Sequence, residues 1–487
     1  MNRSDYAGLP ERFYARVRPT PVERPRLVRF NGALADELGL DFGARDPEVL
    51  AGIYSGNVIP PGVEPIAMAY AGHQFGHFVP QLGDGRAILL GEALDRTGVR
   101  RDIQIKGSGR TPYSRSGDGR AALGPVLREY LVSEAMHALG VPTTRALAAV
   151  ATGELVYRES ALPGAIVTRV ASGFVRVGTF QYFAARGDGE GVRLLADYVI
   201  DRHYPHAKSA SRPYLALLQA VTDAQASLIS RWMLVGFIHG VMNTDNMSIA
   251  GETIDFGPCA FMDSYDPAAV YSSIDSQGRY AYANQPHAAV WNLARFAETL
   301  LPLLDPGAAR AVELAGEALA AFAGRFAEQQ LAGMRRKLGF TACEDGDAGL
   351  AEDLLAAMHR NQADFTLTFR ALCGAAASVG GDEKVRALFA NPREYDEWAR
   401  QWRARLAREP EHPQSRAEAM RKVNPALIPR NHRIEQVIQA AVSAGNFEPF
   451  DALSAALADP YEPPTGAEPY ADPPAPAERV LQTFCGT

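Results

Sequence analysis

The sequence is poor in cysteine and contains neither a basic run nor a long apolar run. Its four cysteines are too few and too scattered among 487 residues for a disulfide scaffold or a zinc cluster. The formal net charge of −7, without a Lys/Arg-rich run, argues against nucleic acid or an anionic membrane as the main partner. No apolar run reaches about 18 residues, and the first residues lack an apolar segment. We therefore expect no membrane span, no signal peptide and a cytoplasmic location.

The composition is typical of a folded protein with roughly two or three domain-sized cores, because 47% of the residues are apolar and 22% are charged. The patterns predict an α+β fold, in which a mixed first part precedes a mostly helical second part. Expected strands cover residues 87–91, 102–106, 147–158 and 164–170. Expected helices cover residues 121–139, 213–237, 286–304, 308–337, 349–359, 383–390, 394–407 and 432–443.

Residues 239–257 carry the strongest chemical signal. Asn246 and Asp255 offer side-chain oxygens, and Phe256-Gly257 adds an apolar group and a residue tolerant of positive φ. Mg²⁺ is commonly held by one or two such oxygens together with water and phosphate oxygens. Protein kinases write the same stretch as H-R-D-x-x-x-x-N followed by D-F-G. The pattern predicts a metal site that handles nucleotide phosphates.

The catalytic base of a kinase is missing from this stretch. When His239 and Asn246 are aligned with the kinase pattern, Val241 occupies the position of the base, and valine cannot accept a proton. Asp245, beside the metal-binding asparagine, can accept one. The chain is therefore either an inactive kinase or an enzyme with different chemistry on the same nucleotide.

A glycine turn and a lysine predict the phosphate half of the site. Asp84-Gly85 favours a tight hairpin turn within residues 81–86, and Lys106 follows at the end of a strand in which Gln104 shares its face. A glycine turn can approach phosphates that such a lysine reaches. The glycine-rich residues 107–120 are either a second phosphate clamp or a flexible insert.

Further charged residues can support this lysine or bind phosphate. Glu129 and Glu134 both lie on the expected helix 121–139, and spacing alone does not decide which of them holds Lys106. Arg169 and Arg176 have the fork geometry that suits phosphate, although either could be an ordinary surface charge.

Together these stretches give the sequence a family resemblance. It resembles the selenoprotein O family, also called the YdiU family, of kinase-fold pseudokinases. The matching stretches run in order between about residues 66 and 290, and the set is far more specific than any one motif. They are Leu82-Gly-Asp-Gly-Arg86, Gln104-Ile-Lys-Gly107, Ser116-Gly-Asp-Gly-Arg120, Arg128-Glu129, Ser133-Glu-Ala-Met136, Val141-Pro-Thr-Thr-Arg145, residues 239–246, Ile254-Asp-Phe-Gly257 and Gln277-Gly-Arg-Tyr280.

The resemblance implies a protein-kinase-like bilobal fold that binds ATP in an inverted orientation and transfers AMP to Ser, Thr or Tyr hydroxyls of proteins. It implies Mg²⁺ or Mn²⁺ as cofactor, and some bacterial members are described as transferring UMP from UTP. Self-modification is a further expectation. The implied nucleotide-binding residues are Gly83, Gly85, Arg86, Lys106, Asp118, Gly119, Arg169, Arg176 and Asp255. Glu129 would support Lys106, Asn246 and Asp255 would bind the metal, and Asp245 would be the proton acceptor.

Composition along the chain, interpreted with this resemblance, predicts four parts. They are an N-terminal extension (1–65), a kinase-like N-lobe (66–185), a helical C-lobe with the metal site (186–458) and a proline-rich tail (459–487). Cys485 stands in this tail where animal members carry selenocysteine, which makes it a redox candidate. Some bacterial relatives pair it with an activation-segment cysteine, but none stands near Tyr271-Ser-Ser273. Cys259 is a substitute, unless the redox lock is absent.

Two other functions stay open from the sequence. The first is ordinary phosphoryl transfer with Asp245 as a displaced base. The second is a non-catalytic nucleotide-binding scaffold, which Val241 favours and which the retained lysine and metal ligands disfavour.

Overall fold

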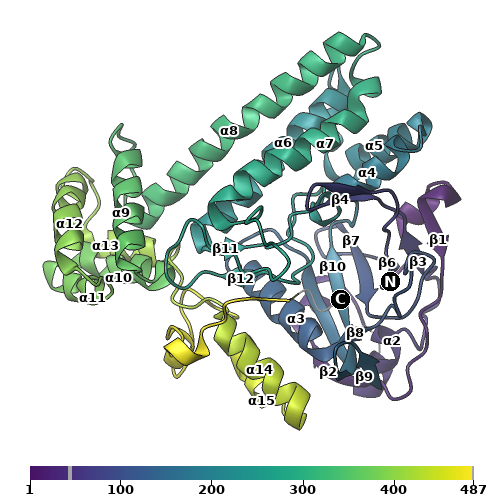
Figure 1. Ribbon diagram of the computed structural model, residues 1–487, viewed down its shortest axis with the longest axis horizontal. Helices are drawn as coiled ribbons and strands as arrows, with labels where there is room; N and C mark the ends of the chain where they lie inside the picture. Colours follow the sequence, from purple (N-terminus) through teal and green to yellow (C-terminus); the bar gives the residue numbers. More distant parts are fainter. Residues whose placement is uncertain (42–45, 485–487) are drawn as a thin grey trace.

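The computed structural model describes residues 1–41 and 46–484, and its fold is α+β. An eight-stranded antiparallel sheet forms one part, with strand order β1-β3-β6-β7-β10-β9-β2 and β8 paired to β10. The helical part lies beside it (Figure 1). The strands of the sheet are β1 (Tyr14–Arg16), β2 (Arg26–Phe30), β3 (Ile66–Met68), β6 (Ala87–Leu94), β7 (Arg100–Lys106), β8 (Ala121–Ala122), β9 (Arg145–Tyr157) and β10 (Ala161–Ala171). Two shorter ribbons are β4 (Gly72–Gln74) with β5 (His77–Val79), and β11 (Phe237–Ile238) with β12 (Ala260–Phe261).

Long helices dominate the second part of the chain (Figure 1). The helix α6 leads through Gly236, which takes the left-handed φ that ends it, into β11 and the loop at His239. The helices are α1 (Gly32–Glu37), α2 (Pro47–Tyr54), α3 (Leu123–Ala138), α4 (Val177–Ala184), α5 (Gly189–His203), α6 (Pro213–Val235), α7 (Gln285–Leu304), α8 (Ala308–Leu338), α9 (Asp347–Asn361), α10 (Phe365–Ala377), α11 (Asp382–Arg386), α12 (Pro392–Leu406), α13 (Pro413–Arg421), α14 (Asn431–Ala444) and α15 (Glu448–Ala456). None of the described helices combines the length and the apolar character that a membrane span requires.

The helix α3 packs its apolar side on the sheet and on α14. Leu127 and Leu131 are buried with Val167 of β10 and Val437 of α14 in one cluster. Burying such side chains is worth about 1.5–3 kcal/mol each. This packing fixes the rotation of α3 and so decides which of its glutamates faces the sheet.

The first 65 residues are part of the sheet. They contribute both of its edge strands, β1 beside β3 and β2 beside β9. The helix α2 packs over the same sheet with Leu50 and Tyr54 in a core that includes Ile103. The segment expected as an extension therefore completes the sheet.

Two local expectations are wrong. Asp84-Gly85 does not close a hairpin, because β5 pairs with β4 while β6 pairs with β3 and β7. Instead, the buried carboxylate of Asp84 accepts a hydrogen bond from the Met68 backbone N–H (3.0 Å). This contact ties the loop at residues 81–86 to β3. The helix expected at 383–390 is only the short α11. The other expected helices and strands are present with small differences in their ends.

The last described residues lie against the segment after Asp255. Thr483 donates its backbone N–H to Tyr271 O (2.7 Å) and its hydroxyl to Pro258 O (2.6 Å). Its carbonyl accepts from Ser273 N–H (3.0 Å). Cys485 lies outside the described residues. Cys259 is buried, with its thiol 3.6 Å from Phe256 O.

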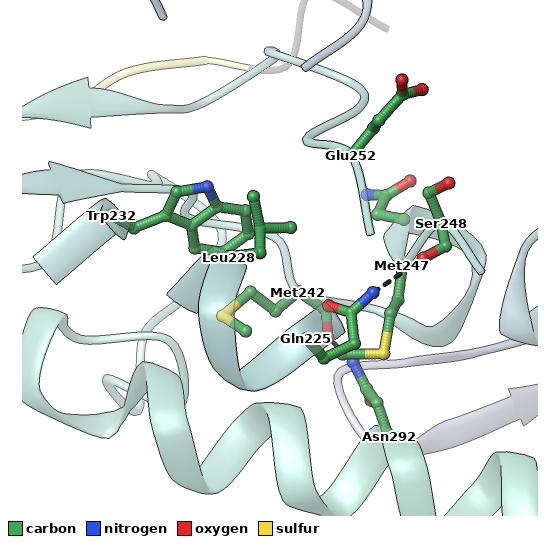
Figure 2. Close-up of a pocket in the computed structure, with 9 residues that line it drawn as sticks. Gln225, Leu228, Trp232, Met242, Met247, Ser248, Glu252 and Asn292 are labelled. Carbon is green, nitrogen blue, oxygen red and sulfur yellow. Dashed lines mark hydrogen bonds between the residues drawn. The ribbon is translucent and has the colours of Figure 1, made fainter. Parts of the chain in front are cut away.

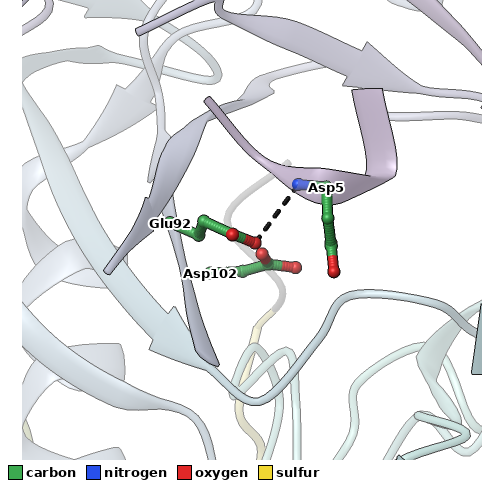
Figure 3. A group of neighbouring side chains, drawn as sticks. All are labelled: Asp5, Glu92 and Asp102. Atoms are coloured by element: carbon green, nitrogen blue, oxygen red, sulfur yellow. Dashed lines mark hydrogen bonds between the residues drawn. The ribbon is translucent and has the colours of Figure 1, made fainter. Parts of the chain in front are cut away.

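A buried guanidinium ties the N-terminal residues to the sheet. Figure 3 shows the carboxylates of Asp5, Glu92 and Asp102 turned toward one another. Arg202 of α5 pairs with all three, at 2.5, 3.1 and 2.9 Å respectively. The group is arranged like a set of metal ligands, but arginine already supplies its positive charge. Asp102 lies near the start of β7, about 13 Å along the strand from Lys106.

We expect Arg202→Met to lower the free energy of unfolding by about 3–5 kcal/mol, because it leaves buried carboxylates without their counter-charge. Urea denaturation measures this change. Arg193→Met, on the same helix but in an exposed pair with Asp197, is the control and should cost less than about 1 kcal/mol. Equal effects of the two substitutions would contradict a structural role for the buried group.

Candidate active site

Asp255 is the centre of the charged site. Its backbone has a φ of +62°, a strained value for a non-glycine residue that turns its carboxylate toward the sheet-side cations. Oδ1 lies 3.2 Å from Lys106 Nζ and 2.5 Å from an Arg169 nitrogen. Oδ2 lies 2.7 Å from Arg176. Burial opposes the charged form, but the guanidiniums of Arg169 and Arg176 hold the pKa of Asp255 well below its usual range.

Glu129 is the second acid of this cluster. One of its oxygens lies 2.8 Å from Lys106 Nζ, and the other accepts from Arg169 Nε. Glu134 points elsewhere and forms a bidentate pair with Arg145 at 2.8 and 2.9 Å. The structure thus places Glu129, and not Glu134, at the lysine. Burial and the neighbouring Arg169 lower the pKa of Lys106.

His239 fastens the metal-ligand loop to the segment that carries Asp255. Its Nδ1 accepts from Val241 N–H (3.3 Å), so Nε2 holds the proton and donates to Ile254 O (2.8 Å). The ring is buried and stacks on Trp232, and burial lowers its pKa. A neutral imidazole satisfies both contacts. His239 is therefore a structural part of the loop.

Asn246 is oriented by the residue that replaces the kinase base. Its Nδ2 donates to Val241 O (3.0 Å), which leaves Oδ1 as the atom that can bind a cation. Asn246 and Asp255 thus present an amide oxygen and a carboxylate oxygen, the donor types that Mg²⁺ and Mn²⁺ accept. The donor set fits such an ion.

Asp245 is a buried carboxylate in which one oxygen is hydrogen-bonded and the other has no hydrogen-bond partner among the described residues. Oδ2 accepts from Gln74 Nε2 (3.1 Å), whereas Oδ1 has no hydrogen-bond partner within the described residues. Burial raises the pKa of Asp245 to about 6, although the Gln74 amide and Arg176 favour the charged form. Gly72 makes room for this carboxylate, since a Cβ there would lie 2.4 Å from Oδ1. Such an oxygen can take a proton from a substrate.

The two glycine-rich loops pack on each other. Gly83 has a φ of +78° and faces the ring of Tyr113, and a Cβ at Gly85 would lie 2.9 Å from Tyr113 O. Ser114 Oγ donates to Gly85 O. The backbone carbonyl of Arg86 accepts a hydrogen bond from Gly107 N–H (2.7 Å). The guanidinium charge of Arg86 contributes to lowering the pKa of Lys106.

Asp118 and Gly119 lie apart from the ion pairs of Asp255. Asp118 pairs with Arg158 (2.8 Å) and is exposed. Gly119 has a φ of +69°, and its carbonyl accepts from Gly109 N–H (3.0 Å). These contacts fold the loop on itself and onto the strand end at Arg158.

Several residues of the site were not singled out from the sequence. Gln74 holds Asp245, and Tyr70 stacks on Arg176 with 4.7 Å between the guanidinium carbon and the ring centroid. Gln104 contacts both Arg169 and Asp84, at 3.3 Å each. For Gln104 a signal was present, because the alternation of β7 places it on the face of Lys106. Gln74 and Tyr70 come from contacts distant in sequence, which no local pattern reveals.

A small cavity lies beneath the Asn246 loop. Figure 2 shows Trp232, Met242, Met247 and Asn292 around it, with Gln225 bonded to Ser248 O (2.7 Å). Its volume of about 10 Å³ is the size of one water molecule. It is a packing gap under the loop and too small for a nucleotide.

The site joins a cluster of cations to two oxygen ligands and a buried proton acceptor. Phosphate groups pair with such cations, and a hard divalent ion binds such oxygens. The fold and the site thus define an enzyme that acts on nucleotide phosphates.

The comparisons give the family. A family model described as "Protein adenylyltransferase SelO" matches residues 2–458. A Rhizobium rhizogenes relative, "Protein nucleotidyltransferase YdiU", is 64% identical over 484 residues, covering 99% of this chain and 96% of the relative. A Bradyrhizobium relative of the same name is 63% identical over 485 residues, covering 100% and 99%. The chain belongs to the SelO family and is an enzyme of the nucleotidyltransferase class, as the sequence resemblance predicted.

We expect Glu129→Gln to lower kcat/KM at least about tenfold, because it removes a counter-charge that positions Lys106 and Arg169. Glu134→Gln is the matched control on the same helix. It should cost stability through Arg145 but leave the turnover per folded molecule nearly unchanged. Steady-state kinetics with ATP on both variants, at equal folded fraction, decides the matter. Loss of turnover in Glu134→Gln alone would reverse the assignment.

Proposed function

We propose that this protein transfers AMP from ATP to Ser, Thr or Tyr hydroxyls of other proteins and releases pyrophosphate. The observation that carries the proposal is the cluster of Lys106, Arg169 and Arg176 around Asp255, beside an Asp245 oxygen that has no hydrogen-bond partner in the part of the chain that the structure describes. The names of the relatives point to the same chemistry. A bilobal, kinase-like arrangement of sheet and helices is part of this proposal.

The cationic cluster determines which phosphorus reacts in this proposal. If Lys106, Arg169 and Arg176 bind the β- and γ-phosphates, the α-phosphorus faces the substrate and the nucleotide is inverted relative to a kinase. The hydroxyl oxygen forms a bond to the α-phosphorus while the bond from that phosphorus to the bridging oxygen breaks. The cations stabilise the charge on the departing pyrophosphate. In this orientation the phosphates take the place of Asp255 at the cations, while Glu129 keeps Lys106 and Arg169 in position.

Asn246 and Asp255 would hold Mg²⁺ or Mn²⁺. When bound, such an ion neutralises phosphate charge and orients the nucleotide. The protein residues supply the rest: Asp245 accepts the hydroxyl proton on Oδ1, and Gln74 fixes the rotation of that carboxylate through Oδ2. Because the nucleophile approaches a different phosphorus, the chemistry does not need a base at position 241.

The remaining assignments are extensions of this proposal. Gly83, Gly85 and Arg86 would line the nucleotide, and Asp118 and Gly119 would contact it from the loop packed on them. UTP as an alternative donor, self-modification, the division at residues 65, 185 and 458, the cytoplasmic location and a redox role for Cys485 stay predictions from the sequence.

We expect intact-mass spectrometry, after incubation of the protein with ATP and Mg²⁺ or Mn²⁺, to show the added mass of AMP on the protein or on an added protein mixture. Label from α-labelled ATP should appear on protein, whereas label from γ-labelled ATP should appear in pyrophosphate. Asp255→Ala should abolish the transfer, because it removes a metal ligand and the partner of three cations. Protein-bound γ-label would instead establish phosphoryl transfer, and ATP binding without transfer to any protein would favour the scaffold.

Asp245→Ala tests the proposed base. We expect transfer to fall at least about a hundredfold, the usual range for loss of a general base, with nucleotide affinity changed little. Titration with ATP measures binding, and the α-label assay measures transfer. Gln74→Leu should give a smaller loss of kcat, since it leaves the carboxylate in place. Wild-type turnover of Asp245→Ala would exclude this residue as the base.

A further inference from the structure

A second pocket lies on the helical side of the molecule, where α6 and α8 pack side by side (Figure 1). Its volume is about 310 Å³. It is lined by the end of α3 and the turn after it, by α6 and α8, and by the chain near residues 422 and 461. It shares no residue with the Asp255 cluster or with the Asn246 loop. A cavity of this size accommodates a small organic molecule.

The charge of this pocket is of one sign. Its lining includes Arg231, Arg336, Lys337 and Lys422, and no Asp or Glu is among the lining residues. The whole chain carries a net charge of −7, so such a group of cations is a local exception. A concave surface lined by one sign of charge concentrates ions of the opposite sign.

Lys337 is the distinctive residue of the pocket. Its side chain is buried, with 3% of its surface exposed, yet its ammonium makes no ion pair or hydrogen bond within the described residues. Its Nζ lies 4.3 Å from the ring centroid of Phe369 and 5.6 Å from that of Phe365. Burial lowers its pKa to about 7. The other buried lysine, Lys106, has two carboxylate partners, so an unpaired one is unusual.

The pocket also offers neutral contacts. Leu234 and Val235 of α6 form an apolar wall, and Ser227 and Tyr461 also line the pocket. Tyr461 donates to Leu139 O (3.0 Å), which anchors the pocket to the end of α3. Apolar walls around a few charged donors are typical of sites for small organic anions.

We propose that this pocket binds a small phosphate ester, whose phosphate pairs with Lys337 and with the guanidiniums of Arg231 and Arg336. Guanidinium groups match phosphate in a bidentate geometry, and the buried ammonium gains the counter-charge that the protein itself does not supply. The organic part of the ligand lies on the apolar wall of α6. The site is separate from the nucleotide site, and the proposal stands without the proposed reaction.

The position of the pocket gives it contact with the active-site supports. Val235 ends the helix that leads into the His239 loop, and Gly140 follows the helix that carries Glu129. Arg231 bridges these two helices by donating to Gly140 O (2.7 Å). A phosphate that pairs with Arg231 therefore contacts the residue that links α3 to α6.

Isothermal titration of the full-length protein with glycerol 3-phosphate, at constant ionic strength, tests the proposal. We expect saturable binding of one molecule per chain and no binding of glycerol. Lys337→Met, which keeps the length and the aromatic contacts, should weaken binding at least tenfold. The double variant Arg231→Gln/Arg336→Gln should do the same. These two arginines are exposed, so this variant keeps the test valid if Lys337→Met does not fold.

Two controls separate this pocket from other sites. Arg325→Gln removes a charge from α8 at a position paired with Asp223 and outside the pocket, and it should leave binding unchanged. Lys106→Met should also retain it. Loss of binding in Lys106→Met alone would place the ester in the nucleotide site. Equal affinity in all variants, or no saturable binding to the wild type, would likewise overturn the proposal.

Discussion

The carboxylate of Asp255 is the interaction on which the arrangement of the site depends. Its three cationic partners come from β7, from β10 and from the residue before α4, and Glu129 adds α3 to the same network. Buried charges are tolerated only when they are paired, so none of these elements can shift without leaving a charge uncompensated. The strained φ of Asp255 is held by this network. Sheet, helix and metal-ligand loop therefore maintain one common geometry.

Much of the fold could be predicted from local patterns. The alternation in β7 and the long apolar spacing of α6 and α8 survive in the structure because local preference and packing agree there. The edge strands β1 and β2 were missed, since they are short and lie among prolines, and their pairing is with residues far along the chain. The prediction of a hairpin at Asp84 was wrong for a related reason. A buried contact with Met68 decided that loop, whereas turn preference alone favoured a hairpin.

The site was readable in part. Motif spacing brought forward Lys106, Asn246 and Asp255, but the choice between Glu129 and Glu134 needed the rotation of α3, which its packing against the sheet and α14 sets. Gln74 could not be assigned, because its partner Asp245 lies 171 positions away. Sequence patterns report neighbours along an element. They do not report which distant loop closes over a carboxylate.

The environment of Val241 opposes the introduction of the aspartate that protein kinases have at this position. Its side chain is buried, its carbonyl orients Asn246, and its N–H holds the ring of His239. An aspartate introduced there would place a new charge in this buried position beside a neutral imidazole. It would thereby destabilise the loop that presents the metal ligand Asn246. Restoring the kinase motif by one substitution would thus damage the site before it gained a base. At this position, conversion to a kinase-like site therefore requires further changes that accommodate the new carboxylate.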